Sequence, residues 1–150
     1  MGAVHNYSVY YIELRAKAED YSTVQGRYAF EVEDWRGRLV RMTQRTFDAH
    51  VEKRAVTIDY LGEAKETISD PDIVQESDTG ATYLYRFGIG RPPYSNLYLM
   101  VIIYYRQREG TQTGIVATYH FTDSLAYHEP VIEYRAQWVN GRRIRLQQGE

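Results

Sequence analysis

The alternation of apolar and polar residues predicts a β-hairpin in the first third of the chain. Tyr28–Glu33 alternates apolar and polar side chains, as a strand with one buried face does. Asp34–Gly37 then suits a type I turn with its glycine in the left-handed region. Arg38–Met42 returns as the second strand.

The period then changes to that of an α-helix. Thr43 is a good N-cap, and the residues after it contain no helix breaker. Side chains spaced at i, i+3, i+4 and i+7 share one face of this helix, namely Phe47, His50, Val51 and Arg54. A second helical pattern covers Thr57–Ile68, with periodic positions at Ile58, Leu61, Ala64, Lys65 and Ile68. It ends before Pro71, because the residue that precedes a proline disfavours helix.

Beyond Pro71 the period is two, which indicates strands. Ile73-Val74 begins a short strand, and Tyr83–Phe87 is a strand with three aromatic rings on one face. Leu97–Tyr105 is almost entirely apolar, which is typical of a central strand buried on both faces. Ile115–Phe121 follows a glycine-containing loop, so the last two strands are expected to pair as a hairpin.

This order of elements predicts a single α+β domain over residues 1–150. An N-terminal hairpin and two helices are expected to pack on a four- to five-stranded antiparallel sheet. A chain of 150 residues can bury its own core. Tyr7–Leu14 fits a strand and a helix equally well, and Val131–Val139 fits a strand or irregular chain. Residues 1–20 and 141–150 are expected to be loose ends.

Composition leaves several partners open. The net charge is −2, so a nucleic-acid site would be a local patch. The chain has 15 Tyr, and 15 Arg against 3 Lys. Arginine can grip phosphate through two hydrogen bonds and tyrosine can stack on bases, but both are also enriched at protein interfaces. We therefore consider three partners: RNA, another protein, and a second copy that binds through an exposed face of Tyr83, Tyr85 and Phe87.

The sequence argues against several other classes of site. Without cysteine there is no disulfide, thiolate metal site or cysteine nucleophile. The phosphate-binding loop, serine elbow, zinc-protease helix and dinucleotide fingerprint are all absent, so we expect no metal or other cofactor. The longest apolar run has nine residues, whereas a membrane helix needs about 20. The N-terminus lacks the pattern of a signal peptide, and we expect a cytoplasmic protein without membrane contact.

His50 and His120 are the candidate catalytic residues. Histidine titrates near neutral pH and can serve as base or acid, although a buried helix histidine and a polar strand face are structural alternatives. Arg54 lies one helical turn after His50 and could hold a phosphate, with Lys53 beside it.

Four further residues are candidates for orienting or binding a substrate. Thr118 and Thr122 flank His120 on one strand face, where their hydroxyls could orient a phosphate. Tyr85 and Arg86 could add stacking and charge. They point to opposite faces of their strand, so at most one of them faces a given site.

The order of these segments resembles a phage- and prokaryote-associated nuclease family of the barnase, EndoU, colicin and RelE-type group. The resemblance covers about Phe30 to Asp123 and includes RMTQRTFDAHVEKR, ISDPDIVQES, YLYRFG, YLMVIIYY and GIVATYHFTD. His50, Val51 and Arg54 match the first half of the helix motif of the family, and Pro71-Asp72 matches its P-D turn. Thr118, Phe121, Thr122 and Asp123 match its terminal strand. The second histidine of the helix motif is replaced by Ala55, and His120 stands where the family has an aromatic residue.

The resemblance implies a metal-independent ribonuclease of toxin type. In such an enzyme a base deprotonates the ribose 2′-OH, an acid protonates the leaving 5′-oxygen, and a cation stabilises the charged phosphorus centre. His50 would be the base or acid, His120 its partner, Arg54 the phosphate clamp and Thr118 an orienting residue. The protein partner that the resemblance implies is an immunity or antitoxin protein. The alternative, favoured by Ala55, is a degenerate nuclease that binds RNA or protein without cleavage.

Overall fold

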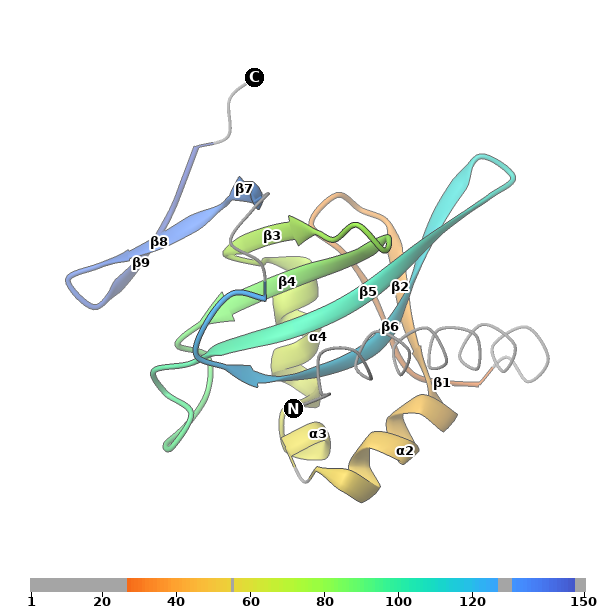
Figure 1. The fold of residues 1–150 in the computed structure, drawn as a ribbon, viewed down its shortest axis with the longest axis horizontal. Helices are drawn as coiled ribbons and strands as arrows, with labels where there is room; N and C mark the ends of the chain where they lie inside the picture. Colours follow the sequence, from red (N-terminus) through yellow and green to blue (C-terminus); the bar gives the residue numbers. More distant parts are fainter. Residues whose placement is uncertain (1–26, 55, 127–130, 148–150) are drawn as a thin grey trace.

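The computed structural model describes residues 27–54, 56–126 and 131–147 of the chain. They form a seven-stranded sheet with the order β1-β2-β6-β5-β4-β3-β7, and a separate hairpin, β8–β9, stands to one side of it (Figure 1). The strands of the large sheet are β1 (Tyr28–Glu33), β2 (Leu39–Thr43), β3 (Ile73–Glu76), β4 (Ala81–Phe87), β5 (Tyr98–Arg108), β6 (Thr111–Thr122) and β7 (Val131–Tyr134). The hairpin consists of β8 (Ala136–Val139) and β9 (Arg142–Arg145), and the helices are α2 (Gln44–Lys53), α3 (Val56–Asp59) and α4 (Leu61–Ser69).

The predicted N-terminal hairpin is confirmed as β1–β2. Gly37 has a φ of 80°, which is the left-handed conformation that the turn requires. The side chain of Asp34 fixes the turn, because its Oδ1 accepts hydrogen bonds from the backbone N–H groups of Arg36 and Arg38 at 2.9 and 2.8 Å. Since Asp34 is buried, these bonds also satisfy a carboxylate removed from water.

The α+β class is confirmed, but the prediction of a four- to five-stranded antiparallel sheet is wrong. The sheet has seven strands and is mixed, because β2 runs parallel to β6 over Leu39–Arg41 and Thr113–Ile115. The hairpin thus extends the sheet instead of packing on its face, and β7 adds a strand at the opposite edge. Apolar alternation predicts that a segment is a strand but carries no information about its neighbour.

The helix after Thr43 is confirmed, and the Thr43 hydroxyl accepts a hydrogen bond from the Thr46 N–H at 3.1 Å. The second predicted helix is instead two helices, α3 and α4, separated at Tyr60. Tyr60 is buried, its ring packs on Phe121 with 4.8 Å between centroids, and its hydroxyl accepts from the Arg91 N–H. Burial of this ring interrupts the periodic pattern, and Ile58 is left 57% exposed.

Both faces of the central strands are buried. One face packs against the helices through a core that includes Phe47, Ile68 and Val101. The other face forms a second core around Met100 and Ile102. The prediction that the β5 segment is buried on both sides is therefore confirmed.

The expectation of an exposed tyrosine face on β4 is wrong. Tyr83 and Tyr85 are only 5% and 0% exposed, because they belong to the second core with Met100 and Ile102. The Tyr85 hydroxyl donates to Gln75 Oε1 at 2.7 Å, which satisfies the polar end of a ring in this position.

The C-terminal part of the described chain is organised as strands. Residues 131–139, which the sequence left open, form β7 and β8, and residues 142–145 of the expected loose end form β9. Arg143 of β9 binds the residue that precedes β3, since its Nε donates to Asp72 Oδ1 at 2.6 Å. Residues 1–20, including the ambiguous segment at 7–14, lie outside the described residues. Within the described ranges, no helix has the length and apolar character needed to cross a membrane.

Gly114 provides a test of the junction between β2, β6 and β5. A Cβ atom at Gly114 would lie 2.8 Å from Ile103 Cγ2 and 3.0 Å from Val40 Cγ2. We expect Gly114→Ala to lower the free energy of unfolding by about 1–3 kcal/mol through overpacking. Gly62→Ala in α4 is the matched control, because nothing lies within 4 Å of its added Cβ and a helix favours alanine over glycine by about 1 kcal/mol. Urea unfolding measures both variants, and equal effects would contradict the described packing.

Candidate functional site

The carboxyl-terminal half of β6 meets helix α2 along one edge of the strand. The parallel ladder with β2 ends at Ile115, and β6 then bulges, with Ala117 as the extra residue against β5. A bulge turns a carbonyl out of the regular ladder. His50 Nε2 bonds the Ala117 carbonyl at 2.9 Å. Helix α2 thus contacts β6 through a side chain just beyond the point where β6 stops pairing with β2.

His50 is held in one tautomer by this bond. A carbonyl can only accept, so Nε2 carries the proton and Nδ1 is the nitrogen that can take up another. The side chain is 4% exposed. Burial lowers the pKa of His50, the bond to Ala117 opposes that shift, and the charges of Arg54 and Lys53 lower the pKa further.

His120 lies three residues beyond Ala117 on β6 and is half-buried. Burial, then the charge of Arg54, then that of His50 lower the pKa of His120 to about 4. The charge of Arg54 thus acts on both imidazoles, and the Ala117 carbonyl that His50 bonds lies three residues before His120 on the same strand. We name His50, Arg54 and His120 the histidine cluster.

Arg54 joins this cluster at the end of α2. It is the C-cap residue in an extended conformation, and its backbone N–H donates to the His50 carbonyl at 2.9 Å. The residue is exposed, so its guanidinium is accessible to a ligand, and the preceding residue, Lys53, is also exposed. The cluster thus combines two imidazoles that are neutral at pH 7 with cationic charge at its rim.

The two threonines of the predicted site flank His120 on β6. Tyr119 and Phe121 face the helices, because the Tyr119 hydroxyl donates to the Thr57 carbonyl and Phe121 packs on Tyr60. By alternation His120 and its two threonines face the opposite side. Thr118 is buried and Thr122 lies at the strand end, where its hydroxyl bonds the Ser124 carbonyl at 3.0 Å.

The structure does not bring Tyr85 or Arg86 into the histidine cluster. Tyr85 lies opposite Met100 on β5, and Met100 lies opposite His120 on β6. Two strand spacings therefore separate the backbones at Tyr85 and His120, a distance of about 10 Å. Arg86 points to acidic partners, with its guanidinium 3.1 Å from Glu66 Oε2 and 3.9 Å from Asp70 Oδ2. Both residues are therefore placed as parts of the scaffold, apart from the two histidines.

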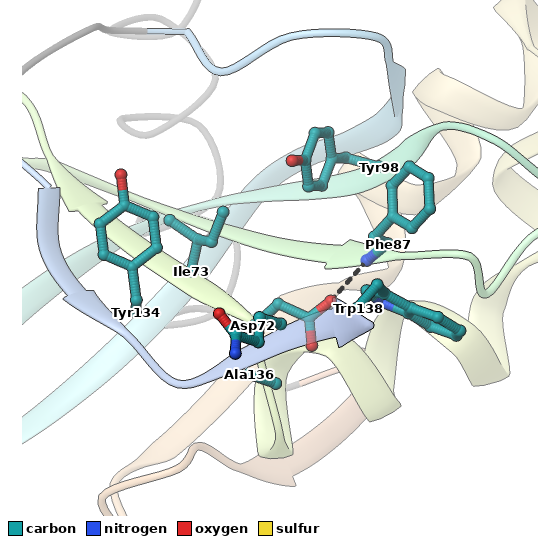
Figure 2. Close-up of a pocket in the computed structure, with 8 residues that line it drawn as sticks. Asp72, Ile73, Phe87, Tyr98, Tyr134, Ala136 and Trp138 are labelled. Atoms are coloured by element: carbon teal, nitrogen blue, oxygen red, sulfur yellow. Dashed lines mark hydrogen bonds between the residues drawn. The ribbon is translucent and has the colours of Figure 1, made fainter. Parts of the chain in front are cut away.

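Two features of the structure were missed by the sequence analysis. One is the bulge at Ala117, for which Gly114 within the strand pattern is the available signal, since isolated glycines in strands accompany irregularities. The other is a pocket of about 410 Å³ between the ends of β4 and β5 and the β7–β8 segment (Figure 2). Its aromatic residues come from four strands and share no sequence period. Among the described residues, no three His, Asp or Glu side chains are grouped as metal ligands would be.

The lowered pKa values of His50 and His120 make stability depend on pH. Unfolded histidine has a pKa of about 6.5, whereas the pKa values of His50 and His120 are lower in the folded protein. Below pH 6.5 the unfolded chain therefore binds more protons, and the free energy of unfolding falls as pH falls. At about 1.4 kcal/mol per pKa unit, His120 contributes no more than about 3 kcal/mol, present in full above pH 6.5.

We expect the melting temperature to decrease between pH 7 and pH 5, and to decrease less in His120→Gln. Differential scanning calorimetry at several pH values measures both proteins. An identical pH dependence of wild type and variant would contradict the burial of His120 as a neutral group.

No family model, curated protein or solved structure matches this chain. The resemblance of its motifs to the ribonuclease group therefore stands as a hypothesis. The fold class by itself does not select a function, because one fold supports many activities. The chemistry of the histidine cluster has to carry the functional argument.

Proposed function

We propose that this protein cleaves RNA by attack of a ribose 2′-OH on the adjacent phosphate, with the histidine cluster as the site. The proposal is supported by the bond from His50 Nε2 to the Ala117 carbonyl, three residues before His120 on β6, and by the charge of Arg54, which acts on both imidazoles. Two proton-transfer groups and one cation are the set that metal-independent transesterification requires. The motif resemblance includes His50 and Arg54, whereas His120 stands where the family has an aromatic residue.

The tautomer of His50 suits the role of base. Its Nδ1 accepts the proton of the 2′-OH while Nε2 stays bonded to the Ala117 carbonyl, so the ring keeps its orientation during transfer. The 2′-oxygen forms a bond to phosphorus, and the bond to the 5′-oxygen breaks. His120, in its protonated form, gives a proton to that leaving oxygen. The products are a 2′,3′-cyclic phosphate and a 5′-OH.

The electrostatics of the cluster support phosphate binding. Arg54 and Lys53 lower the pKa of His50, and Arg54 lowers that of His120, so both imidazoles experience positive potential. A bound phosphate offsets that potential and raises both pKa values, which allows His120 to carry the proton it must donate. Arg54 is exposed and can make two parallel hydrogen bonds to the phosphate.

A second candidate function is RNA binding without cleavage. It is favoured by the 4% exposure of His50, which the bond to Ala117 explains as a structural contact, and by Ala55 in place of the second histidine of the motif. In this case Arg54 and Lys53 hold the RNA backbone, and binding weakens steeply as salt is added.

The proposal predicts cleavage of total RNA and tRNA in EDTA by the purified protein, with fragments that end in 2′,3′-cyclic phosphate. His50→Gln and His120→Gln should each lower the cleavage rate by about 10²–10⁴-fold, because each removes a proton-transfer group. Arg54→Gln should also lower the rate strongly, since it removes the cation at the phosphate. Gel and mass analysis of the fragments measures rate and end group.

Arg45→Gln is the matched control, because Arg45 is an exposed arginine of the same helix, outside the cluster. It should retain the wild-type rate within a few-fold. Intact RNA at high protein excess, with salt-sensitive binding that is lost in Arg54→Gln, would replace cleavage by the binding function. Cleavage that survives in both histidine variants would place the activity elsewhere.

A further inference from the structure

The pocket between the ends of β4 and β5 and the β7–β8 segment, named here the aromatic pocket, shares no residue with the histidine cluster. Four rings line it, from Phe87, Tyr98, Tyr134 and Trp138. Figure 2 shows Tyr98, Phe87 and Trp138 on one side of the opening and Tyr134 on the other, with Asp72 between them. A volume of about 410 Å³ lies within the range of small-ligand pockets, which is about 300–1,000 Å³.

The rings are inclined steeply to one another. Phe87 and Tyr98 have an interplanar angle of 68°, and Phe87 and Trp138 an angle of 69°. Steeply inclined rings wall a box, whereas a nucleobase is held between parallel faces. The shape therefore suits a roughly spherical group better than a planar one.

Two of the large rings that line the pocket are exposed. Tyr134 is 55% exposed and Trp138 is 39% exposed. Trp138 is nevertheless fixed in place, because its ring covers Gly88 so closely that an added Cβ there would lie 3.0 Å from it. Fixed, exposed aromatic side chains around a hollow are a feature of binding sites.

The charge that lines the pocket is negative. Asp72 is the charged side chain among the described lining residues. Its Oδ2 accepts the Phe87 N–H at 2.8 Å and its Oδ1 pairs with Arg143 at 2.6 Å, so the carboxylate is rigidly placed. Arg143 and Arg86, whose Nε atoms lie 2.6 and 3.8 Å from Asp72 Oδ1, offset part of this charge from outside the lining. The charge of Asp72 still reaches into the pocket, because it adds to burial in raising the pKa of Tyr98.

We propose that this pocket binds a quaternary or methylated ammonium group. The negative faces of the rings attract a cation, the fixed carboxylate adds to that attraction, and the methyl groups fill the apolar box. Such a group occurs in free choline-type compounds and in methylated lysine side chains. The same chemistry recognises both sources, and the experiment distinguishes them.

Isothermal titration with choline, together with NMR of the Trp138 indole N–H, tests the proposal. We expect choline to bind. Its neutral isostere 3,3-dimethyl-1-butanol, in which carbon replaces the charged nitrogen, should bind with an affinity at least about tenfold lower. Trp138→Ala should weaken choline binding about tenfold. Ile144→Ala on the same hairpin is the control, because Ile144 is 45% exposed, does not line the pocket and should leave affinity unchanged.

A peptide with trimethyl-lysine, compared with the same peptide unmethylated, identifies the source. Tighter binding of the methylated peptide than of choline assigns the site to a protein side chain, and the reverse assigns it to a small molecule. Equal affinities of choline and its isostere would overturn the proposal. So would the absence of binding of both choline and the methylated peptide at about 10 mM ligand, a concentration at which even weak binding is detected. Binding of adenosine in place of choline would overturn it in favour of base stacking.

Discussion

The hydrogen bond between His50 and the carbonyl of Ala117 connects helix α2 to strand β6 of the large sheet. β2 stops pairing with β6 at Ile115, and the chain leaves the sheet to form α2. The carbonyl at the bulge then needs another donor, since a buried acceptor without one costs about 1–3 kcal/mol. A single imidazole meets this requirement, and it fixes how α2 lies along β6.

This bond also determines the chemistry of the cluster. It fixes which nitrogen of His50 can take up a proton. Burial of the ring favours its neutral form, and the bond to Ala117 opposes that effect. Because His50 lies one turn before the helix end, Arg54 follows it as the C-cap and acts on His120 as well. A structural role and a catalytic role are thus compatible for His50, since the two nitrogens of the ring serve different purposes.

Local patterns predicted the elements that depend on neighbouring residues. The hairpin with Gly37, the cap at Thr43 and the doubly buried β5 follow from turn chemistry, capping and apolar content. The parallel pairing of β2 with β6 and the break at Tyr60 depend on contacts between distant segments, which periodicity does not encode. The placement of Arg86 likewise depends on acidic partners on α4 and before β3. The aromatic pocket gathers rings from separate strands and had no signal in the sequence.

Electrostatic coupling of His50, Arg54 and His120 in one cluster can be tested directly by an NMR pH titration of the imidazole resonances, in wild type, Arg54→Gln and the control Arg45→Gln. We expect His120 to titrate at about pH 4 and His50 below 6.5. We also expect loss of the Arg54 charge to raise both pKa values, and Arg45→Gln to leave them unchanged. A His120 that titrates near 6.5 and does not respond to Arg54→Gln would contradict the cluster.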